Sequence, residues 1–390
     1  MRDPLNKTIT TIQPSGIRKF FDVVHEMKDA ISLGVGEPDF DTPWHIRDEG
    51  IYSLEKGKTH YTSNAGLKEL KTEIDRYLNR HYGISYDVDH EIMVTIGGSE
   101  AIDAAMRAML DPGDEVLVFA PYFGEYNSYA ANFDAKTVAV HPDPETFQPD
   151  LGDFAAKFTE KTKAVIINTP NNPTGVVYSD ATLKAIADIL KEKQKAYKKE
   201  IYLVSDEPYR ELVYDGQKEN FLTKYYENTI VGYSFSKSLS LPGERIGYVV
   251  VPNEVADADT VIAGINVSNR TLGFVNAPSL IQLAVAECLE EKTDVAYYDK
   301  NRTRLYEALT GYGYTCIKPE GAFYMWVKSP DEDEDRFVEQ AKKYHLILVK
   351  GGAFCWPGYV RIAYCVSYDT IERSLPAFEK LAEEYQLSGK

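Results

Sequence analysis

The sequence predicts an α/β protein with a mainly parallel β-sheet and a second, smaller α+β domain. The first indication is a series of short apolar segments that alternate with helical stretches through the middle of the chain. Short buried strands separated by helices are typical of a parallel sheet with both faces covered. The second is a change of pattern toward the C-terminus, where a helical stretch precedes strand-like segments joined by polar loops. Of the 390 residues, 44% are hydrophobic, which suffices for a sizeable core.

The individual elements follow from the apolar runs and the turn signals between them. We expect strands at residues 91–96, 115–120, 136–140, 163–169, 202–206 and 230–236. Helices are expected at 100–110 and 180–197, and later at 297–312, which two strands at 323–329 and 359–367 follow. The first segment of the chain lacks this rhythm, so we expect it to pack on the C-terminal domain. The predicted domains are residues 46–285, and residues 1–45 together with 286–390.

Charge and cysteine content exclude several classes of function. The chain carries 43 Lys and Arg against 60 Asp and Glu, a net charge of −17, which argues against nucleic acid or an anionic membrane as a partner. No apolar run approaches the ~20 residues that span a bilayer, and the first residues lack the apolar region of a signal peptide. The four cysteines form no Cys-x-x-Cys pair or zinc pattern, so we expect reduced thiols, no metal site and a cytoplasmic protein.

Ligands of parallel sheets bind at the carboxyl ends of the strands, so the residues that follow each strand are the candidates. Gly97, Gly98 and Ser99 open a helix, whose free N–H groups and dipole suit an anion. The alternative is an ordinary junction with Ser99 as the N-cap. After the apolar run KAVII (163–167), the loop 168–175 holds three asparagines, two prolines and a glycine. It could present an amide to a ligand or serve only as a rigid turn.

Three further groups carry charge. Asp206 ends a buried strand and needs a cationic partner or several donors, with Tyr209 three residues on, although Asp206 could also cap a helix. Lys237 and Arg245 lie among hydroxyls and small residues, where a lysine could act as an amine nucleophile and an arginine could bind phosphate; the alternative is a solvated loop. Arg361 lies inside an apolar strand and could bind a carboxylate bidentately, or form a structural ion pair or an edge-strand contact.

These groups together describe the binding site of pyridoxal 5′-phosphate (PLP). A lysine amine can form a Schiff base with the aldehyde of this cofactor, and a carboxylate can keep its pyridine nitrogen protonated, so that the ring accepts electrons. A phenol and an amide can donate hydrogen bonds to the ring oxygen, and the glycine-rich helix start with an arginine can hold the phosphate. The sequence therefore predicts PLP as the cofactor.

From about Ser32 to Val366 the sequence resembles the class I/II aminotransferases, which belong to fold type I of the PLP enzymes. The resemblance includes the aspartate, aromatic and acyl-diaminopimelate types. Motifs in the family's order carry it: GVGEPDF (34–40), YTSNAGLKELK (61–71), GGSEAI (97–102), DPGDEVLVFAPYFGEY (111–126), NNPTG (171–175), SDEPY (205–209), SFSKSLSLPGERIGY (234–248), PEGAFYMW (319–326) and VRIAY (360–364). It implies a seven-stranded, mainly parallel sheet and a homodimer. The implied activity is ping-pong transfer of an amino group from an L-amino acid to a 2-oxo acid.

The resemblance also implies a role for each matching residue. Lys237 would form the Schiff base and carry the proton, and Asp206 would pair with the pyridinium nitrogen. The remaining contacts to the cofactor would come from residues around its ring and phosphate: Asn172 and Tyr209 at the ring oxygen, Phe123 stacked on the ring, and Gly98, Ser99, Ser234, Ser236 and Arg245 at the phosphate. Tyr61 would reach that phosphate from the neighbouring subunit. Arg361 would bind the substrate carboxylate, with Gly36 and Asn172 beside it.

One departure and two alternatives bear on the function. Aspartate-selective relatives carry a lysine directly after the Gly-Gly pair, where this chain has Ser99, so the sequence does not identify the amino donor. A PLP-dependent C–S lyase of the cystathionine type uses the same cofactor and many of the same motifs. A PLP-sensing transcriptional regulator would need a basic DNA-binding extension, for which this acidic chain has no spare length.

Overall fold

The computed structural model describes residues 4–12, 27, 29–291 and 293–387 of the chain. A seven-stranded sheet with the strand order β2-β8-β7-β6-β5-β3-β4 forms the centre of the larger part. Only β8 runs antiparallel to its neighbours, so the predicted mainly parallel α/β sheet is confirmed. Its strands are β2 (Ile92–Thr95), β3 (Glu115–Phe119), β4 (Lys136–Val140), β5 (Thr162–Asn168), β6 (Tyr202–Asp206), β7 (Thr229–Ser234) and β8 (Gly247–Val250).

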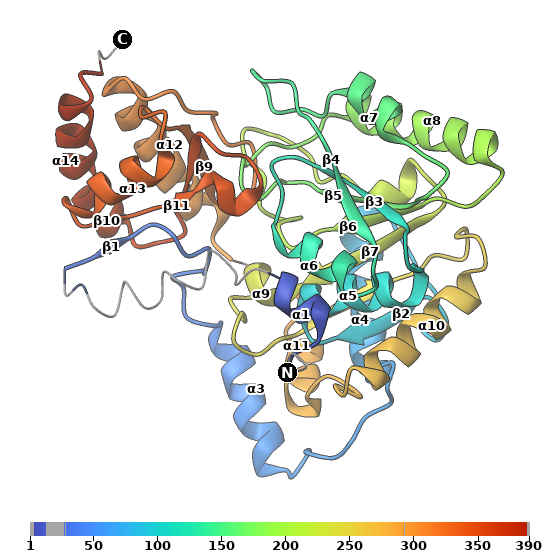
Figure 1. Ribbon diagram of the computed structural model, residues 1–390. Helices are drawn as coiled ribbons and strands as arrows, with labels where there is room; N and C mark the ends of the chain where they lie inside the picture. The colour runs from blue at the N-terminus through green and yellow to red at the C-terminus, as the bar shows by residue number, and fades with distance from the viewer. Residues whose placement is uncertain (1–3, 13–26, 28, 292, 388–390) are drawn as a thin grey trace.

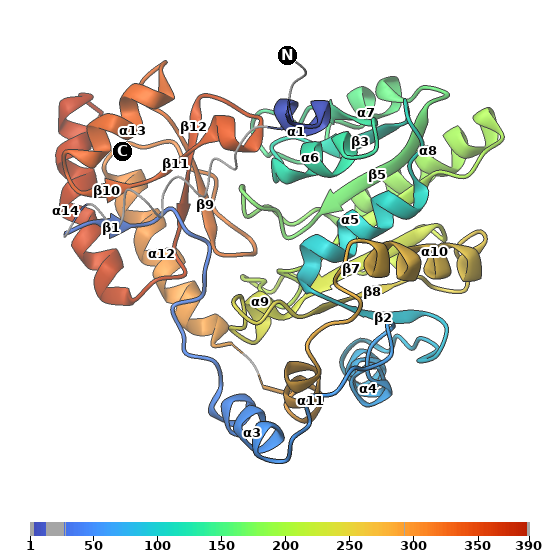
Figure 2. The same ribbon diagram turned by 60° about the horizontal axis from the view of Figure 1, so that its bottom comes forward.

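Helices cover both faces of this sheet, and the alternation of side chains along each strand explains why (Figures 1 and 2). In β3, Val116 and Val118 pack in one cluster with α5 and α10, whereas Leu117 and Phe119 pack in another with α7 and α8. Because both faces are buried, the strands consist of nearly continuous apolar residues. The helices of this part are α3 (Trp44–Glu55), α4 (Lys68–Tyr82), α5 (Gly97–Met109), α6 (Glu125–Ala131), α7 (Leu151–Lys157), α8 (Asp180–Tyr197), α9 (Phe235–Ser238), α10 (Ala258–Thr271) and α11 (Ser279–Glu287), with a 3₁₀ turn at Leu222–Lys224.

The C-terminal part has its own antiparallel sheet with the order β11-β12-β9. Its elements are α12 (Val295–Gly311), β9 (Tyr324–Lys328), α13 (Glu334–Lys342), β10 (Leu346–Ile347), β11 (Val349–Lys350), a 3₁₀ turn at Gly351–Phe354, β12 (Tyr359–Ala363) and α14 (Tyr368–Glu384). One apolar cluster joins α12, α13 and α14 to this sheet. In Figure 1 the orange and red elements of this part lie beside the large sheet.

The N-terminal segment divides its contacts between the two parts. Strand β1 (Ile31–Ser32) pairs in parallel with β10, and Leu33 lies in the apolar cluster of the C-terminal part. This agrees with the expected packing, whereas the short helix α1 (Lys7–Thr11) lies near α6 in Figure 2. The exact domain boundaries, at residues 45/46 and 285/286, stay a prediction. Within the described residues, no helix is both long and apolar enough to cross a bilayer.

Candidate active site

Lys237 lies on α9, a single helical turn that directly follows β7. Ser234 caps this turn, because its Oγ accepts a hydrogen bond from Ser236 N at 3.2 Å. The Lys237 amine donates to the carbonyl oxygen of Gly36. Burial lowers the pKa of Lys237 to about 8, and the nearby Arg361 guanidinium acts in the same direction. A large share of this amine is therefore neutral near pH 8, which a nucleophile requires.

Gly36 brings the N-terminal segment against the lysine. A Cβ atom at this position would lie 2.0 Å from the Tyr324 hydroxyl oxygen, so a side chain larger than hydrogen does not fit unless Tyr324 moves. The close approach places the Gly36 carbonyl beside Lys237 Nζ.

Asp206 lies at the carboxyl end of β6, next to Asn168 at the end of the parallel strand β5. Tyr126 on α6 donates a hydrogen bond to Asp206 Oδ2 at 2.5 Å. Burial raises the pKa of Asp206 to about 7, although the Tyr126 hydrogen bond opposes the rise. No helix begins here, so the N-cap alternative is wrong. The carboxylate needs a positive partner to be fully ionised at neutral pH.

The asparagine loop after β5 has two functions. Asn171 stabilises the turn, because its Oδ1 accepts from the backbone N and the hydroxyl of Thr174 at 3.1 and 2.8 Å. Asn168 fixes the strand end through its contacts with Asp206 O at 2.9 Å and Asn172 N at 2.7 Å. The side chain of Asn172 points elsewhere, to Arg361.

Arg361 lies in β12, the central strand of the three-stranded sheet, so it is no edge-strand residue. Its Nη1 donates to Asn172 Oδ1 at 2.9 Å and its Nη2 to the carbonyl of Gly34 at 2.6 Å. The guanidinium lies between the rings of Tyr324 and Phe354, 4.2 and 4.7 Å from their centroids. Among the described residues it pairs with no carboxylate, and its Nε has no hydrogen-bond partner although the residue is buried. A buried cation with an unused donor fits a carboxylate ligand.

Tyr209 follows Asp206 by three residues and is buried. Its hydroxyl forms a 2.8 Å hydrogen bond with the hydroxyl of Tyr324, and the two rings meet edge to face. Burial, with the neighbouring Tyr324 hydroxyl, raises the pKa of Tyr209 well above its ordinary value, so Tyr209 is a neutral phenol in the site.

The N-terminus of α5 faces Ser234 and Arg245. The helix begins at Gly97 and no side chain caps it, so Ser99, its exposed third residue, is not the N-cap. Gly97 has a φ of +77°, and a Cβ there would lie 2.9 Å from an Arg245 nitrogen. A Cβ on Gly98 would lie 3.3 Å from Ser234 Cβ, and Ser234 and Ser236 share a 2.9 Å hydroxyl contact. Free N–H groups, hydroxyls and a guanidinium thus meet at one place, which suits a phosphate.

Phe123 and Tyr61 are the remaining residues that the sequence predicts for the site, and, among the described contacts, only Phe123 connects to the other candidates within one chain. Phe123 is half-buried and meets the ring of Tyr126 edge to face at 5.8 Å, which connects it to the Asp206 end of the site. Tyr61 is 92% exposed, and within one chain no described contact joins it to the other candidates.

Sequence reasoning assigned no role to Tyr126, Tyr324 or Asn168. Each contacts a predicted residue, and each lies inside or next to a motif: Tyr126 three residues after Phe123, Tyr324 in PEGAFYMW, and Asn168 before NNPTG. Their roles depend on contacts between residues far apart in the sequence, such as Tyr126 with Asp206, which local patterns do not reveal.

Comparisons with known proteins identify the family of the chain. The family model of aminotransferase class I and II matches residues 28–378. The chain is 37% identical to the putative aminotransferase YugH of Bacillus subtilis, over 96% of this chain and 97% of the relative. It is 34% identical to an aspartate aminotransferase of Pyrococcus abyssi, over 98% and 100% of the two chains. A crystal structure of an aminotransferase from Eubacterium rectale superposes with a TM-score of 0.92 at 39% identity, over 98% and 100% of the chains.

The family match covers most of the chain, and these relatives cover nearly all of it. The α/β architecture with its seven-stranded sheet agrees with the solved aminotransferase structures, and the substrates of this family are amino acids and 2-oxo acids. The chain therefore belongs to the aminotransferase class I and II family and is a PLP-dependent aminotransferase.

Proposed function

We propose that this site transfers an amino group from an L-amino acid to a 2-oxo acid in a ping-pong reaction, with Lys237 as the covalent and proton-carrying residue. The observation that carries the proposal is the Lys237 amine on the turn after β7, which donates to the Gly36 carbonyl and whose pKa desolvation lowers to about 8. Such an amine can attack a carbonyl carbon near neutral pH and can then exchange a proton.

The residues of the site fit PLP. The uncapped start of α5, with Gly98, Ser99, Ser234, Ser236 and Arg245, would hold the phosphate. Asp206 would bind the pyridine nitrogen, which supplies the positive partner that its buried carboxylate needs. Asn172 and Tyr209 would donate to the ring oxygen, and Phe123 would stack on the ring. When bound, PLP supplies an aldehyde and a protonated ring that accepts electrons from the substrate Cα.

The proposed chemistry of the protein is a set of binding and proton steps. Lys237 Nζ would accept the proton from the substrate Cα and return it to the carbon on the other side of the substrate nitrogen, which is general acid–base catalysis by one amine. The Asp206 carboxylate would stay ionised and hold the ring nitrogen in its charged form, so that it would stabilise the charge that develops. In the second half-reaction the same groups act in reverse on the oxo acid.

Arg361 would hold the α-carboxylate that donor and acceptor share. Its Nη1 and Nη2 are already oriented by Asn172 and Gly34, and its Nε is unused. A guanidinium fixed between two aromatic rings loses little further freedom when a carboxylate binds. With Gly36 beside it, this grip would orient the Cα–H bond toward Lys237 Nζ.

We also propose that the enzyme is a cytoplasmic homodimer in which Tyr61 completes the neighbouring phosphate site. Large apolar side chains are exposed on α3 and at the end of α10, among them Trp44, Leu54, Val267 and Phe274. The Tyr61 segment lies close to these helices, because Asn269 on α10 donates to Asn64 O at 3.4 Å. Exposed apolar surface around a phenol that has no role within its own chain supports a shared site.

Borohydride reduction of the purified holoenzyme tests the central proposal. The cofactor should be fixed to Lys237 and recovered on the peptide that contains it; recovery on another lysine would contradict the assignment. A screen of amino donors against 2-oxoglutarate, oxaloacetate and pyruvate should then show multiple turnovers and identify the donor that the sequence leaves open at Ser99. Release of a thiol from cystathionine without amine transfer would favour the C–S lyase.

A further inference from the structure

The turn that carries Lys237 is poorly supported by packing on one side. A cavity of about 210 Å³ lies beside it, lined by Phe235, Ser238 and Leu239 from the turn and by Glu211 and Thr293 opposite. Helix α9 has only four residues, so it contributes few hydrogen bonds of its own. Phe235 and Leu239 anchor the turn in the apolar core, so on the cavity side polar contacts must hold the backbone next to Lys237.

The first support is a polar chain from Ser238 to Glu211. The Tyr233 hydroxyl lies 2.9 Å from both carboxylate oxygens of Glu211 and 2.8 Å from Ser238 Oγ. A phenol has one proton, which the carboxylate accepts, so Ser238 Oγ can donate its own proton to the phenol oxygen. These hydrogen bonds connect Ser238, the residue after Lys237, to Tyr233 on β7 and to Glu211 in the segment after β6.

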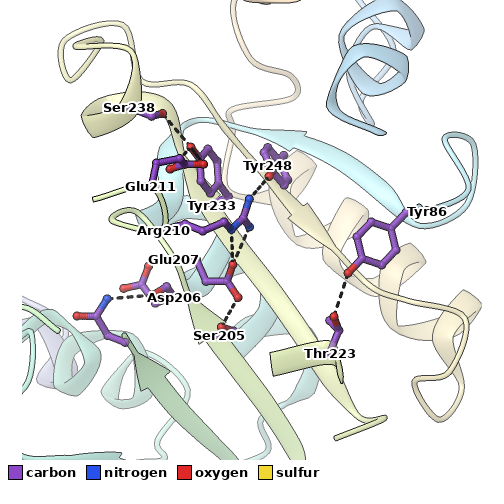
Figure 3. A network of polar contacts seen from close by, with 11 residues as sticks. Tyr86, Ser205, Asp206, Glu207, Arg210, Glu211, Thr223, Tyr233, Ser238 and Tyr248 are labelled. Carbon is purple, nitrogen blue, oxygen red and sulfur yellow. Dashed lines mark hydrogen bonds and ion pairs between the residues drawn. The ribbon is translucent and has the colours of Figure 1, made fainter. Parts of the chain in front are cut away.

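The Tyr233 ring is itself held firmly (Figure 3). The Arg210 guanidinium lies 4.4 Å from its centroid, and the Tyr248 ring stacks on it at 4.8 Å. Arg210 is buried and paired with the Glu207 carboxylate at 2.7 Å, and it also donates to the Tyr248 hydroxyl at 3.0 Å. The Tyr233 hydroxyl oxygen is therefore held in one position, where Ser238 Oγ can bond to it.

The second support comes from Thr293, at the entry to α12. Its Oγ1 lies 3.0 Å from the carbonyl oxygen of Lys237 and 2.8 Å from that of Ser238, and its backbone N donates to Ser238 O at 3.2 Å. These carbonyls have no partner within so short a helix, so Thr293 supplies it.

We propose that Tyr233, Ser238 and Thr293, with Glu211 behind them, are positioning residues that fix the Lys237 backbone on the side of the turn that faces the cavity. No hydrogen bond of these side chains reaches a residue assigned to the substrate or the phosphate, so loss of their hydroxyl groups should disturb mainly the lysine. The inference rests on the proposed role of Lys237. Borohydride labelling of the wild-type enzyme tests that role separately, so a failure of either one can be recognised.

Three variants and a control test the proposal. Tyr233→Phe keeps the stacked ring and removes only the hydroxyl, Ser238→Ala removes the other partner, and Thr293→Val removes the second support. Each should lower kcat roughly tenfold, the change that a lost interaction of ~1.4 kcal/mol gives, with KM for the amino acid unchanged. Tyr233→Phe and Ser238→Ala combined should lose no more than one of them alone, because they share one contact.

Tyr248→Phe is the matched control, since it keeps the ring that stacks on Tyr233 and the Arg210–Glu207 ion pair, and removes only a buried hydroxyl that has no contact to α9. It should lower the melting temperature and leave kcat unchanged. A second readout uses the apoenzyme: competitive labelling with acetic anhydride across pH should give a Lys237 pKa that is higher in the variants than in the wild type, because a loosened turn lets water reach the amine.

Several results would overturn the proposal. Unchanged kcat and unchanged Lys237 labelling in Ser238→Ala and Thr293→Val would do so, even if Tyr233→Phe failed to fold. So would a loss that appears mainly in KM, or a Tyr248→Phe variant that changes Lys237 as much as Tyr233→Phe does.

Discussion

Replacement of Tyr126 by phenylalanine should change the charge state of Asp206 with little change in shape. The Tyr126 hydroxyl donates to Asp206 Oδ2 at 2.5 Å, and it is the interaction that most lowers the pKa of a carboxyl group that burial raises to about 7. Without it the carboxylate keeps the cost of burial and loses its main donor. Its pKa must therefore rise further.

The expected magnitude follows from the energy of a hydrogen bond to a charged group, about 1.5–3 kcal/mol, which corresponds to a rise of about 1 to 2 in the pKa of Asp206. Near pH 7 most of the variant apoenzyme would then carry a neutral Asp206, which offers no negative charge to the ring nitrogen of PLP. We expect the affinity of the apoenzyme for PLP to fall roughly tenfold at pH 7 and to recover as the pH rises toward 9, where Asp206 ionises again.

The assay is the pH profile of PLP binding to the apoenzyme, in which the acidic limb should move to higher pH in Tyr126→Phe. Tyr122→Phe is the control. Its ring lies nearly parallel to that of Tyr126, at 6.3 Å between centroids, but its hydroxyl donates to Asn127 rather than to Asp206. Superimposable profiles of wild type and Tyr126→Phe would refute the reasoning, as would an equal displacement in Tyr122→Phe.

Two further predictions concern the substrate and the dimer. Arg361→Lys keeps the charge but cannot reproduce the two guanidinium contacts to Asn172 and Gly34. The KM values for donor and acceptor should therefore both rise by about one to two orders of magnitude, with a smaller loss in kcat. Steady-state kinetics on both substrates test this, and a change in only one KM would contradict the proposed role of Arg361. Mixing inactive Lys237→Ala subunits with an inactive Tyr61 variant should restore activity, because one site of the mixed dimer holds both wild-type residues; no recovery despite measured subunit exchange would place the whole site within one chain.

The sequence predicts the strands that contain a clear run of apolar residues. Helix α8 begins and ends where the sequence predicts it, and β2 to β6 agree within a few residues. The expected strand 230–236 ends earlier, at Ser234, because Ser234 caps the turn α9. The two-residue strands β1, β10 and β11 have no periodicity to read, and the four-residue strand β8 follows a loop within a motif. Their pairing depends on contacts between distant segments.

The candidate site was predictable where chemistry coincides with a strand end. Asp206 and Lys237 were found because polar residues directly follow buried strands, and Arg361 because an arginine within an apolar strand needs a partner. Tyr126 escaped notice because its partner is 80 residues away. The N-cap prediction for Ser99 was wrong because the helix begins two residues earlier, at a glycine with positive φ.

Asp206 and Lys237, which are proposed to bind the cofactor, destabilise the folded apoenzyme. Burial raises the pKa of Asp206 from 3.8 to about 7, so the stability that its neutral form contributes is lost as the pH rises through 7. Burial lowers the pKa of Lys237 from 10.5 to about 8, so the stability that its neutral amine contributes is lost as the pH falls through 8. Between pH 7 and 8 both groups therefore destabilise the apoenzyme together. A ligand that offers a positive ring nitrogen to Asp206 and a carbon to Lys237 relieves both costs at once, so tight binding follows from the poor fit of these groups to an unliganded interior.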